Sequence, residues 1–167
     1  EADRVSGLKI HPSANKVAVN DERWRPFFEL AERRGWAILV HCGRWQEMSS
    51  YKHALLAAEK FPGVPFFLAH MGGDTPPLAT ATQDAIAAGG FRNVWLGLEG
   101  MREFFYVARG IERLGIERFI FGSDYPVGHP RMYLGLIEAL RLTDADISES
   151  EIARLRERIR NARVGGR

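Results

Sequence analysis

The segment FFLAHMGG, residues 66–73, decides how the rest of the sequence is interpreted. Its apolar start, bounded by turn residues, is typical of a short strand that is buried on both faces of a parallel sheet. His70 follows that strand directly, and two other apolar runs end in the same way, one at His41 and one at Asp124. Because the carboxyl ends of parallel strands meet at one rim, where α/β enzymes hold their active sites, we expect these three side chains to lie together.

Strand and helix patterns alternate along the chain. The predicted strands cover residues 6–11, 38–41, 66–70, 94–98 and 119–122. Amphipathic or capped segments predict helices over residues 20–34, 50–61 and 77–88, around 104–111 and 133–140, and from a capping box at 148–151. This strict alternation favours βαβ units and a parallel sheet.

The spacing of the strand ends narrows the fold to two α/β architectures. Successive ends are 24 to 30 residues apart, close to the roughly 31 residues per unit of a (β/α)8 barrel in which ~250 residues form eight units. A doubly wound sheet allows a similar spacing, but its strand ends spread along a line. In a barrel the strands surround a common axis, so side chains from several strand ends can converge on one point. Residue types that bind metals, at the ends of several strands, therefore favour the α/β TIM barrel.

Composition and charge indicate a globular chain that needs no polyanionic partner. The 167 residues fit one domain, with 46% hydrophobic and 26% charged residues and a net charge of +2. The arginine-rich end, residues 154–167, has no interleaved aromatic side chains, so we expect no nucleic-acid partner. Cys42 is the only cysteine, which excludes an internal disulfide. No apolar run approaches the ~20 residues that cross a bilayer, so we expect no membrane partner and a cytoplasmic location.

Four motifs, in the right order, resemble strands four, five, six and eight of the amidohydrolase-2 branch of the metal-dependent amidohydrolase superfamily. They are GLKIHP, ILVHCG, FFLAHMGG and FIFGSDYP, at residues 7–12, 38–43, 66–73 and 119–126, and IRNAR at residues 159–163 is similar to the end of that family. The resemblance implies that residues 1–167 supply roughly strands 4–8 of a single (β/α)8 barrel domain. It also implies that the N-terminal strands are absent, because the family's first strand ends in His-x-His and this sequence contains none.

The same resemblance implies roles for the three rim residues. His41 corresponds to the metal ligand of the fifth strand and Asp124 to that of the eighth, with one divalent ion, expected to be zinc, as the cofactor. Imidazole and carboxylate groups are ligands that zinc takes, and catalytic sites leave one position for water. A carboxylate beside an activated water can accept its proton, so Asp124 is also the candidate general base. His70 usually stands beside that water in the family, which implies a catalytic role.

A second group of residues has weaker signals for substrate binding. Arginine with aromatic side chains suits a small carboxylated or aromatic substrate. The candidates, on the strand ends and the loops that follow them, are Lys9, His11, Arg44, Trp45, Glu99 and Tyr125, with Arg102 and His129 in the same loops. Structural roles compete with this interpretation: an exit turn for His11 before proline, simple pairing for Lys9, and helix capping for Glu99. Cys42 is expected to be a small buried hydrophobe.

Three functions remain open from the sequence. The first is metal-dependent hydrolysis of a carbonyl-type C–N or C–O bond of a small substrate. The second, which the family also hosts, is non-hydrolytic decarboxylation or hydration of an aromatic or unsaturated acid. The third is an inactive fragment or scaffold module, because two ligands alone would hold zinc incompletely. The expected partner is a small-molecule substrate, and the oligomeric state, a homodimer included, stays open.

Overall fold

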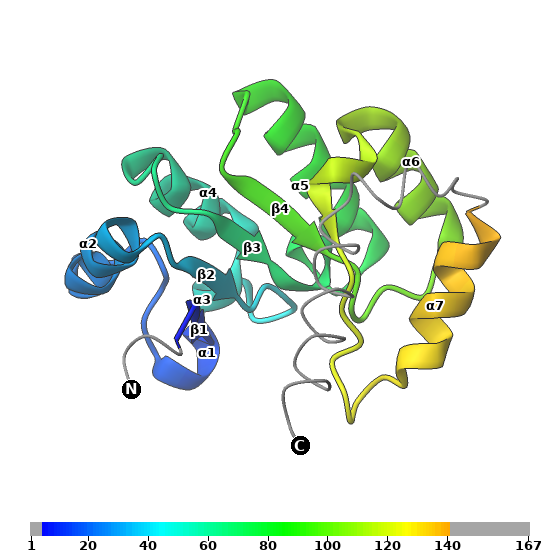
Figure 1. Ribbon diagram of the computed structural model, residues 1–167, viewed down its shortest axis with the longest axis horizontal. Helices are drawn as coiled ribbons and strands as arrows, with labels where there is room; N and C mark the ends of the chain where they lie inside the picture. The colour runs from blue at the N-terminus through cyan, green and yellow to red at the C-terminus, as the bar shows by residue number, and fades with distance from the viewer. Residues whose placement is uncertain (1–4, 141–167) are drawn as a thin grey trace, which may run out of the picture.

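The protein is described by a computed structural model that covers residues 5–140. Five strands form one parallel sheet in sequential order, β1-β2-β3-β4-β5, as the prediction requires (Figure 1). They are β1 (Gly7–Ile10), β2 (Ala37–Val40), β3 (Phe66–Leu68), β4 (Val94–Gly97) and β5 (Phe119–Ile120). A sheet that adds each new strand beside the last is the arrangement of a barrel portion, so the predicted fold class is confirmed.

Helices fill the connections between the strands. The α-helices are α1 (Pro12–Asn15), α2 (Arg25–Arg34), α3 (Gln46–Ser49), α4 (Tyr51–Lys60), α5 (Pro76–Gly89), α6 (Phe104–Leu114) and α7 (Pro130–Ala139). Three 3-10 turns accompany them, η2 (Glu22–Trp24), η3 (Ala69–Gly72) and η4 (Ile116–Arg118). None of the described helices is long and apolar enough to span a membrane.

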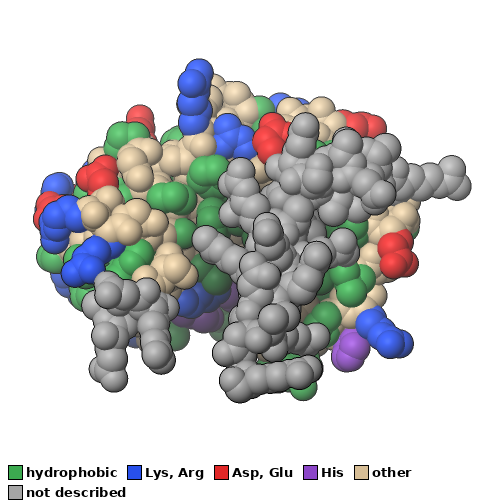
Figure 2. Space-filling model, viewed as in Figure 1, with side chains coloured by type: hydrophobic (Ala, Val, Ile, Leu, Met, Phe, Trp, Pro, Cys, Tyr) green, Lys and Arg blue, Asp and Glu red, His purple; other side chains and the backbone are tan. Residues whose placement is uncertain are grey.

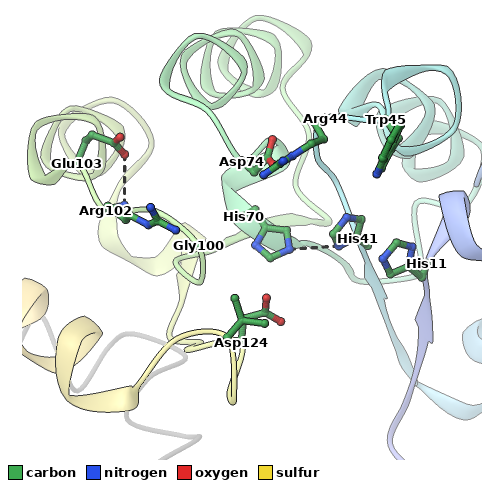
Figure 3. A pocket seen from close by; sticks show the side chains of 11 residues that line it. His11, His41, Arg44, Trp45, His70, Asp74, Gly100, Arg102, Glu103 and Asp124 are labelled. Atoms are coloured by element: carbon green, nitrogen blue, oxygen red, sulfur yellow. Dashed lines mark hydrogen bonds and ion pairs between the residues drawn. The ribbon is translucent and has the colours of Figure 1, made fainter.

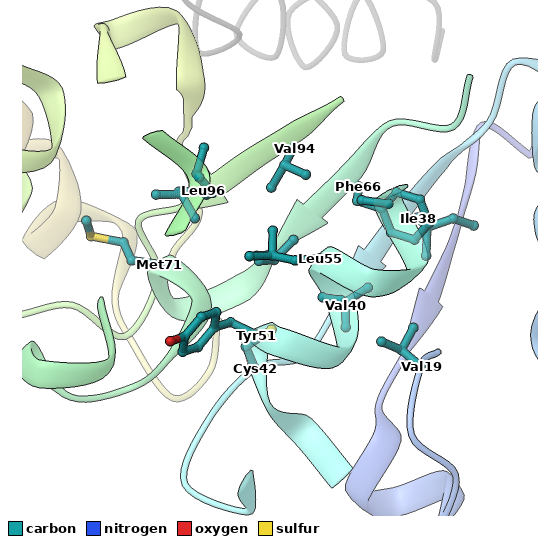
Figure 4. Packing of buried hydrophobic residues seen from close by; sticks show 14 of the residues in the cluster. Val19, Ile38, Val40, Cys42, Tyr51, Leu55, Phe66, Met71, Val94 and Leu96 are labelled. Atoms are coloured by element: carbon teal, nitrogen blue, oxygen red, sulfur yellow. The ribbon is translucent and has the colours of Figure 1, made fainter. Parts of the chain in front are cut away.

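The two faces of the sheet differ because successive side chains on a strand point to opposite sides. One face is fully buried against the helices, and Val40, Phe66 and Leu96 are 0–1% exposed (Figure 4). On the other face Leu39 and Phe67, which pair in register, are only partly buried. The core therefore lies between the sheet and the helices. The polar residues that follow the strands lie at one rim of the sheet.

Several predicted boundaries are wrong: the strand predicted over residues 119–122 ends at Ile120, and the helix predicted around 133–140 begins at Pro130. Two other differences have a local reason. The helix predicted over residues 20–34 begins only at Arg25, because Asp21 caps the 3-10 turn η2 and Pro26 then occupies the first turn of α2. The strand predicted over residues 66–70 ends at Leu68, so His70 lies in η3.

On the surface, ion pairs between charged side chains surround α2, at the left of Figure 2. The predicted helix from residue 148, the IRNAR segment and the arginine-rich end lie outside the described residues.

Candidate active site

A pocket of about 430 Å³ lies at the rim where the strands end (Figure 3). Its lining comes from the loops that follow all five strands: His11, His41, Arg44, Trp45, His70, Asp74, Gly100, Arg102, Glu103, Asp124 and Val127. Seven of the predicted site residues are among them, Arg102 included. The predicted convergence of polar groups is thus present in the structure, from segments more than 100 residues apart.

The backbone takes an unusual conformation where His70 and Asp124 follow their strands. His70 has φ 56°, Met71 has φ 52° and Asp124 has φ 52°, all in the left-handed region. Residues other than glycine adopt this region rarely, and such residues concentrate at functional sites. His70 is also 6% exposed, so the turn places its imidazole below the pocket surface rather than in solvent.

A chain of hydrogen bonds fixes which ring nitrogens carry protons. The Nδ1 of His70 lies 3.0 Å from the backbone carbonyl of Glu99, which can only accept, so Nδ1–H is the donor. In neutral His70 the other nitrogen, Nε2, then accepts from the Nδ1–H of His41, 3.2 Å away. Neutral His41 is left with an unprotonated Nε2. Neutral imidazole binds metals through the lone pair of such an unprotonated nitrogen.

Burial keeps both imidazoles neutral at ordinary pH. Desolvation, followed by the charges of His11 and His70, lowers the pKa of His41 to about 4, while the carboxylate of Asp124 opposes the shift. The pKa of His70 is also lowered, again mainly by desolvation, although the Glu99 carbonyl and Asp124 act the other way. Neutral imidazoles can serve as ligands or proton acceptors, so the electrostatics suit the predicted chemistry.

His11 combines a structural role with a place in the pocket. Its Nδ1 accepts a hydrogen bond from the backbone of Ala14 at 3.3 Å, which caps the short helix α1. Its ring stacks on that of His41, with the centroids 3.9 Å apart and the planes 11° from parallel. The exit turn expected before Pro12 is therefore present, and it also buries one face of His41.

A carboxylate that sequence reasoning missed, Asp74, also lines the pocket, on the same side as His41. Asp74 accepts a hydrogen bond from Nε of Arg44 through Oδ2 at 3.0 Å, while its Oδ1 is buried and has no partner among residues 5–140. Glu103, beside the anticipated Arg102, also lines the pocket. The one available signal for Asp74 was its position directly after the Gly72-Gly73 pair that closes the His70 turn. Arg44 is thus a partly neutralised cation at the pocket mouth.

Four of the candidate substrate-binding residues do not line the pocket, and one of them, His129, caps α7 instead. Tyr125 is 73% exposed. Lys9 lies on the sheet face that carries Leu39, and burial lowers its pKa while Glu99 and Asp124 raise it. Glu99 is 9% exposed, and its carboxylate lies against Gly97 and Gly122. The helix capping expected for it does not occur, because Glu103 is the N-cap of α6. Cys42 is fully buried, as predicted.

The donor atoms fit a metal ion only in part. His41 offers a neutral nitrogen and Asp124 a carboxylate, both accepted zinc ligands. Within residues 5–140, however, no set of three His, Cys, Asp or Glu side chains is grouped closely enough to hold an ion. Within residues 5–140, the predicted ligands His41 and Asp124 therefore do not form a complete metal site by themselves.

Comparisons with known proteins address the family and the fold of the chain. The sequence model of the amidohydrolase family matches residues 1–159. No curated protein matches the chain in sequence. Among solved structures, 5-carboxyvanillate decarboxylase from Sphingomonas paucimobilis is similar, with a TM-score of 0.64 and 22% identity over 87% of this chain and 56% of that one.

Two further solved structures contain metals. One is a dihydroxybenzoic acid decarboxylase from Polaromonas with bound manganese and an inhibitor (TM-score 0.60, 16% identity, 80% of this chain and 52% of that one). The other is an amidohydrolase from Burkholderia multivorans with bound zinc (TM-score 0.64, 17% identity, 81% of this chain and 57% of that one). At these identities the likeness shows the fold. The chain spans 52% to 57% of the length of the three structures.

Proposed function

The chain belongs to the amidohydrolase family, and from this premise we propose that it supplies part of the active site of a metal-dependent hydrolase. The proposed reaction is attack of water on a carbonyl-type C–N or C–O bond of a small, carboxylated or aromatic substrate. The observation that supports it most directly is the chain of hydrogen bonds from the Glu99 carbonyl through His70 to His41, which leaves the Nε2 of neutral His41 unprotonated, beside Gly43 and Asp74.

The protein's own residues would then have distinct roles. His41 and Asp124 would hold a divalent ion, with the remaining ligands supplied by a part of the barrel outside residues 5–140. Such an ion supplies Lewis acidity and a water whose pKa falls to about 7 when it is bound. Asp124 would accept the proton of that water. His70 can take part only by giving up the hydrogen bond from His41, because both interactions use its single Nε2 lone pair.

The pocket mouth supports the proposed substrate class. Arg44 and Arg102 line it from two different loops, and Trp45, which is 61% exposed, adds an aromatic surface on the side of Arg44 and His11 (Figure 3). Guanidinium groups bind carboxylates in a bidentate manner and stack on aromatic faces. A small aromatic or unsaturated acid would match both features.

A decarboxylase is the second candidate, because two of the solved structures similar to this chain are decarboxylases of aromatic acids. Decarboxylation breaks a C–C bond, releases carbon dioxide and delivers a proton to the carbon, whereas hydrolysis adds water across the broken bond. The two reactions therefore give different products. A panel of aromatic acids, lactones and amides distinguishes the candidates: a decarboxylase releases carbon dioxide, whereas a hydrolase opens a ring or releases an amine.

Metal content tests the proposal independently of the substrate. In the product of the complete gene, we expect about one divalent ion per chain, measured by elemental analysis after dialysis. His41→Ala and Asp124→Ala should each lose most of it. His129→Ala is the matched control, because this histidine caps α7 outside the pocket and should keep the metal. Stoichiometric metal in the His41→Ala, Asp124→Ala double variant would contradict the proposed metal site. A wild-type protein that is metal-free and inactive would favour the scaffold function.

A further inference from the structure

A single peptide unit connects the site to the helix that follows it. The carbonyl of the Glu99–Gly100 peptide accepts the Nδ1–H of His70 at 3.0 Å, and the N–H of the same peptide donates to the hydroxyl of Tyr133 at 2.8 Å. The C=O and N–H of a planar trans peptide point in opposite directions. The peptide therefore lies between the imidazole and the phenol, and fixing one end fixes the other.

The local backbone leaves this peptide little freedom. Gly100 has φ 81°, and a Cβ at that position would come 2.6 Å from the Nδ1 of His70. Only glycine allows both the conformation and the close approach. His70 is therefore packed directly against the turn whose orientation Tyr133 holds.

Tyr133 also contacts the turn that carries Asp124. A Cβ on Gly128 would come 2.7 Å from Cε2 of Tyr133, so the ring packs against the backbone there. The N–H groups of Val127 and Gly128 in turn donate to the carbonyl of Asp124, at 2.8 Å and 3.3 Å. One side chain of α7, 5% exposed, thus supports the turns of both candidate catalytic residues.

We propose that Tyr133 is a positioning residue, whose hydroxyl holds the Glu99–Gly100 peptide so that His70 keeps the Nδ1–H tautomer and its Nε2 faces His41. This inference rests on the proposed function for its catalytic meaning, but its geometry does not. Tyr133 does not line the pocket, so it acts through His70 and not on the substrate. Plain core packing of Tyr133 would need the ring and not the hydroxyl.

Tyr133→Phe removes the hydroxyl and keeps the ring. Nuclear magnetic resonance of ¹⁵N-histidine-labelled protein reports which nitrogen is protonated and how fast its proton exchanges with solvent, and His70→Gln assigns the signal. In the wild type we expect a protected Nδ1–H on His70. In Tyr133→Phe we expect its exchange to accelerate at least tenfold, with a population of the Nε2–H tautomer. Tyr51→Phe is the control, since Tyr51 is another buried tyrosine of the core, away from this peptide, and should leave the signal unchanged.

A second pair of variants tests the same support while the hydroxyl of Tyr133 stays in place. Gly128→Ala presses on the backbone carbonyl of Ser123 and on the ring and hydroxyl of Tyr133, and it should shift the His70 signal. Gly135→Ala, on the same helix as Tyr133 with open space around it, should not. An unchanged His70 signal in both Tyr133→Phe and Gly128→Ala would overturn the inference. Where a substrate is known, kcat of Tyr133→Phe should fall about tenfold with KM changed less than twofold. Because the resonance readout needs no turnover, failure of the proposed reaction leaves this test intact.

Discussion

Two turns at the same rim, one after β3 and one after β5, place candidate residues in nearly the same backbone conformation but in different surroundings. His70, with φ 56°, is buried and hydrogen-bonded through both ring nitrogens. Asp124, with φ 52°, is exposed, and its carboxylate has no hydrogen-bond partner among residues 5–140 (Figure 3).

The two turns differ in how many contacts from residues 5–140 hold their side chains in place. The His70 turn is held by groups within this part of the chain: the Glu99 carbonyl, the glycine at 100 and the ring of His41. The Asp124 turn fixes a direction for its carboxylate but supplies nothing for it to bind. The His70 side of the pocket is thus organised in advance by the protein itself, whereas the carboxylate of Asp124 is left without a partner among residues 5–140.

The largest expected effect comes from crowding the His70 turn. Gly100→Ala combines a positive φ, which costs roughly 1–2 kcal/mol for an L-residue, with a clash against His70 that adds about 1–3 kcal/mol. We expect the free energy of unfolding to fall by about 3 kcal/mol, as measured by urea denaturation. Gly90→Ala, at φ 62° with nothing within 4 Å, should lose only the backbone part, about 1 kcal/mol. Equal losses would show that the turn is not tightly packed on His70.

The second effect tests the hydrogen bonds of His70 themselves. His70→Leu leaves the Glu99 carbonyl and the Nδ1–H of His41 without their described partners, and an unsatisfied buried group costs about 1–3 kcal/mol. A loss of about 2 kcal/mol is therefore expected in the same urea titration. His129→Leu removes an exposed cap to the backbone of Arg131 and should cost about 1 kcal/mol or less. If the two variants are equally stable, the tautomer chain contributes little to the fold.

The third effect concerns Glu99, whose carboxylate lies between the two turns, against Gly97 and Gly122. Burial, helped by Asp124 and opposed by Lys9, raises the pKa of Glu99 from 4.5 to about 7. The folded state therefore holds the proton more tightly than the unfolded state does. This stabilisation is fully present below pH 4.5 and is lost as the pH rises to about 7.

Glu99→Gln should remove that dependence. Between these two pH values the wild type is expected to lose roughly 1 kcal/mol per pH unit relative to the variant, measured as the difference in unfolding free energy at each pH. The difference cancels contributions from histidines, which both proteins share. Glu29→Gln, at a carboxylate on α2 with 46% of its side chain exposed, should run nearly parallel to the wild type. Parallel curves for Glu99→Gln as well would place its carboxyl in contact with solvent.

Much of this contrast could be predicted from the sequence, and part of it could not. The strands, their parallel order and the arrival of His41, His70 and Asp124 at one rim follow from apolar runs and their spacing. The end of β3 at Leu68 could not be predicted from the sequence, because Ala69 continues the apolar run although the backbone already turns at that residue. The left-handed conformation of His70 depends on tertiary support from residue 100. Local patterns do not contain such contacts, and for the same reason Asp74 was missed.

The smallest expected effect separates stability from function at Asp124. Asn keeps the shape of the side chain and tolerates a positive φ, and an exposed group without described partners contributes little to folding. Asp124→Asn should therefore change the unfolding free energy by less than about 0.5 kcal/mol, while weakening the metal retention proposed above. Asp124→Val, whose β-branched side chain is strained at φ 52°, should cost about 1–2 kcal/mol. If Asp124→Asn is as destabilising as Asp124→Val, the carboxylate is held by contacts within the protein, and the two turns are more alike than the geometry indicates.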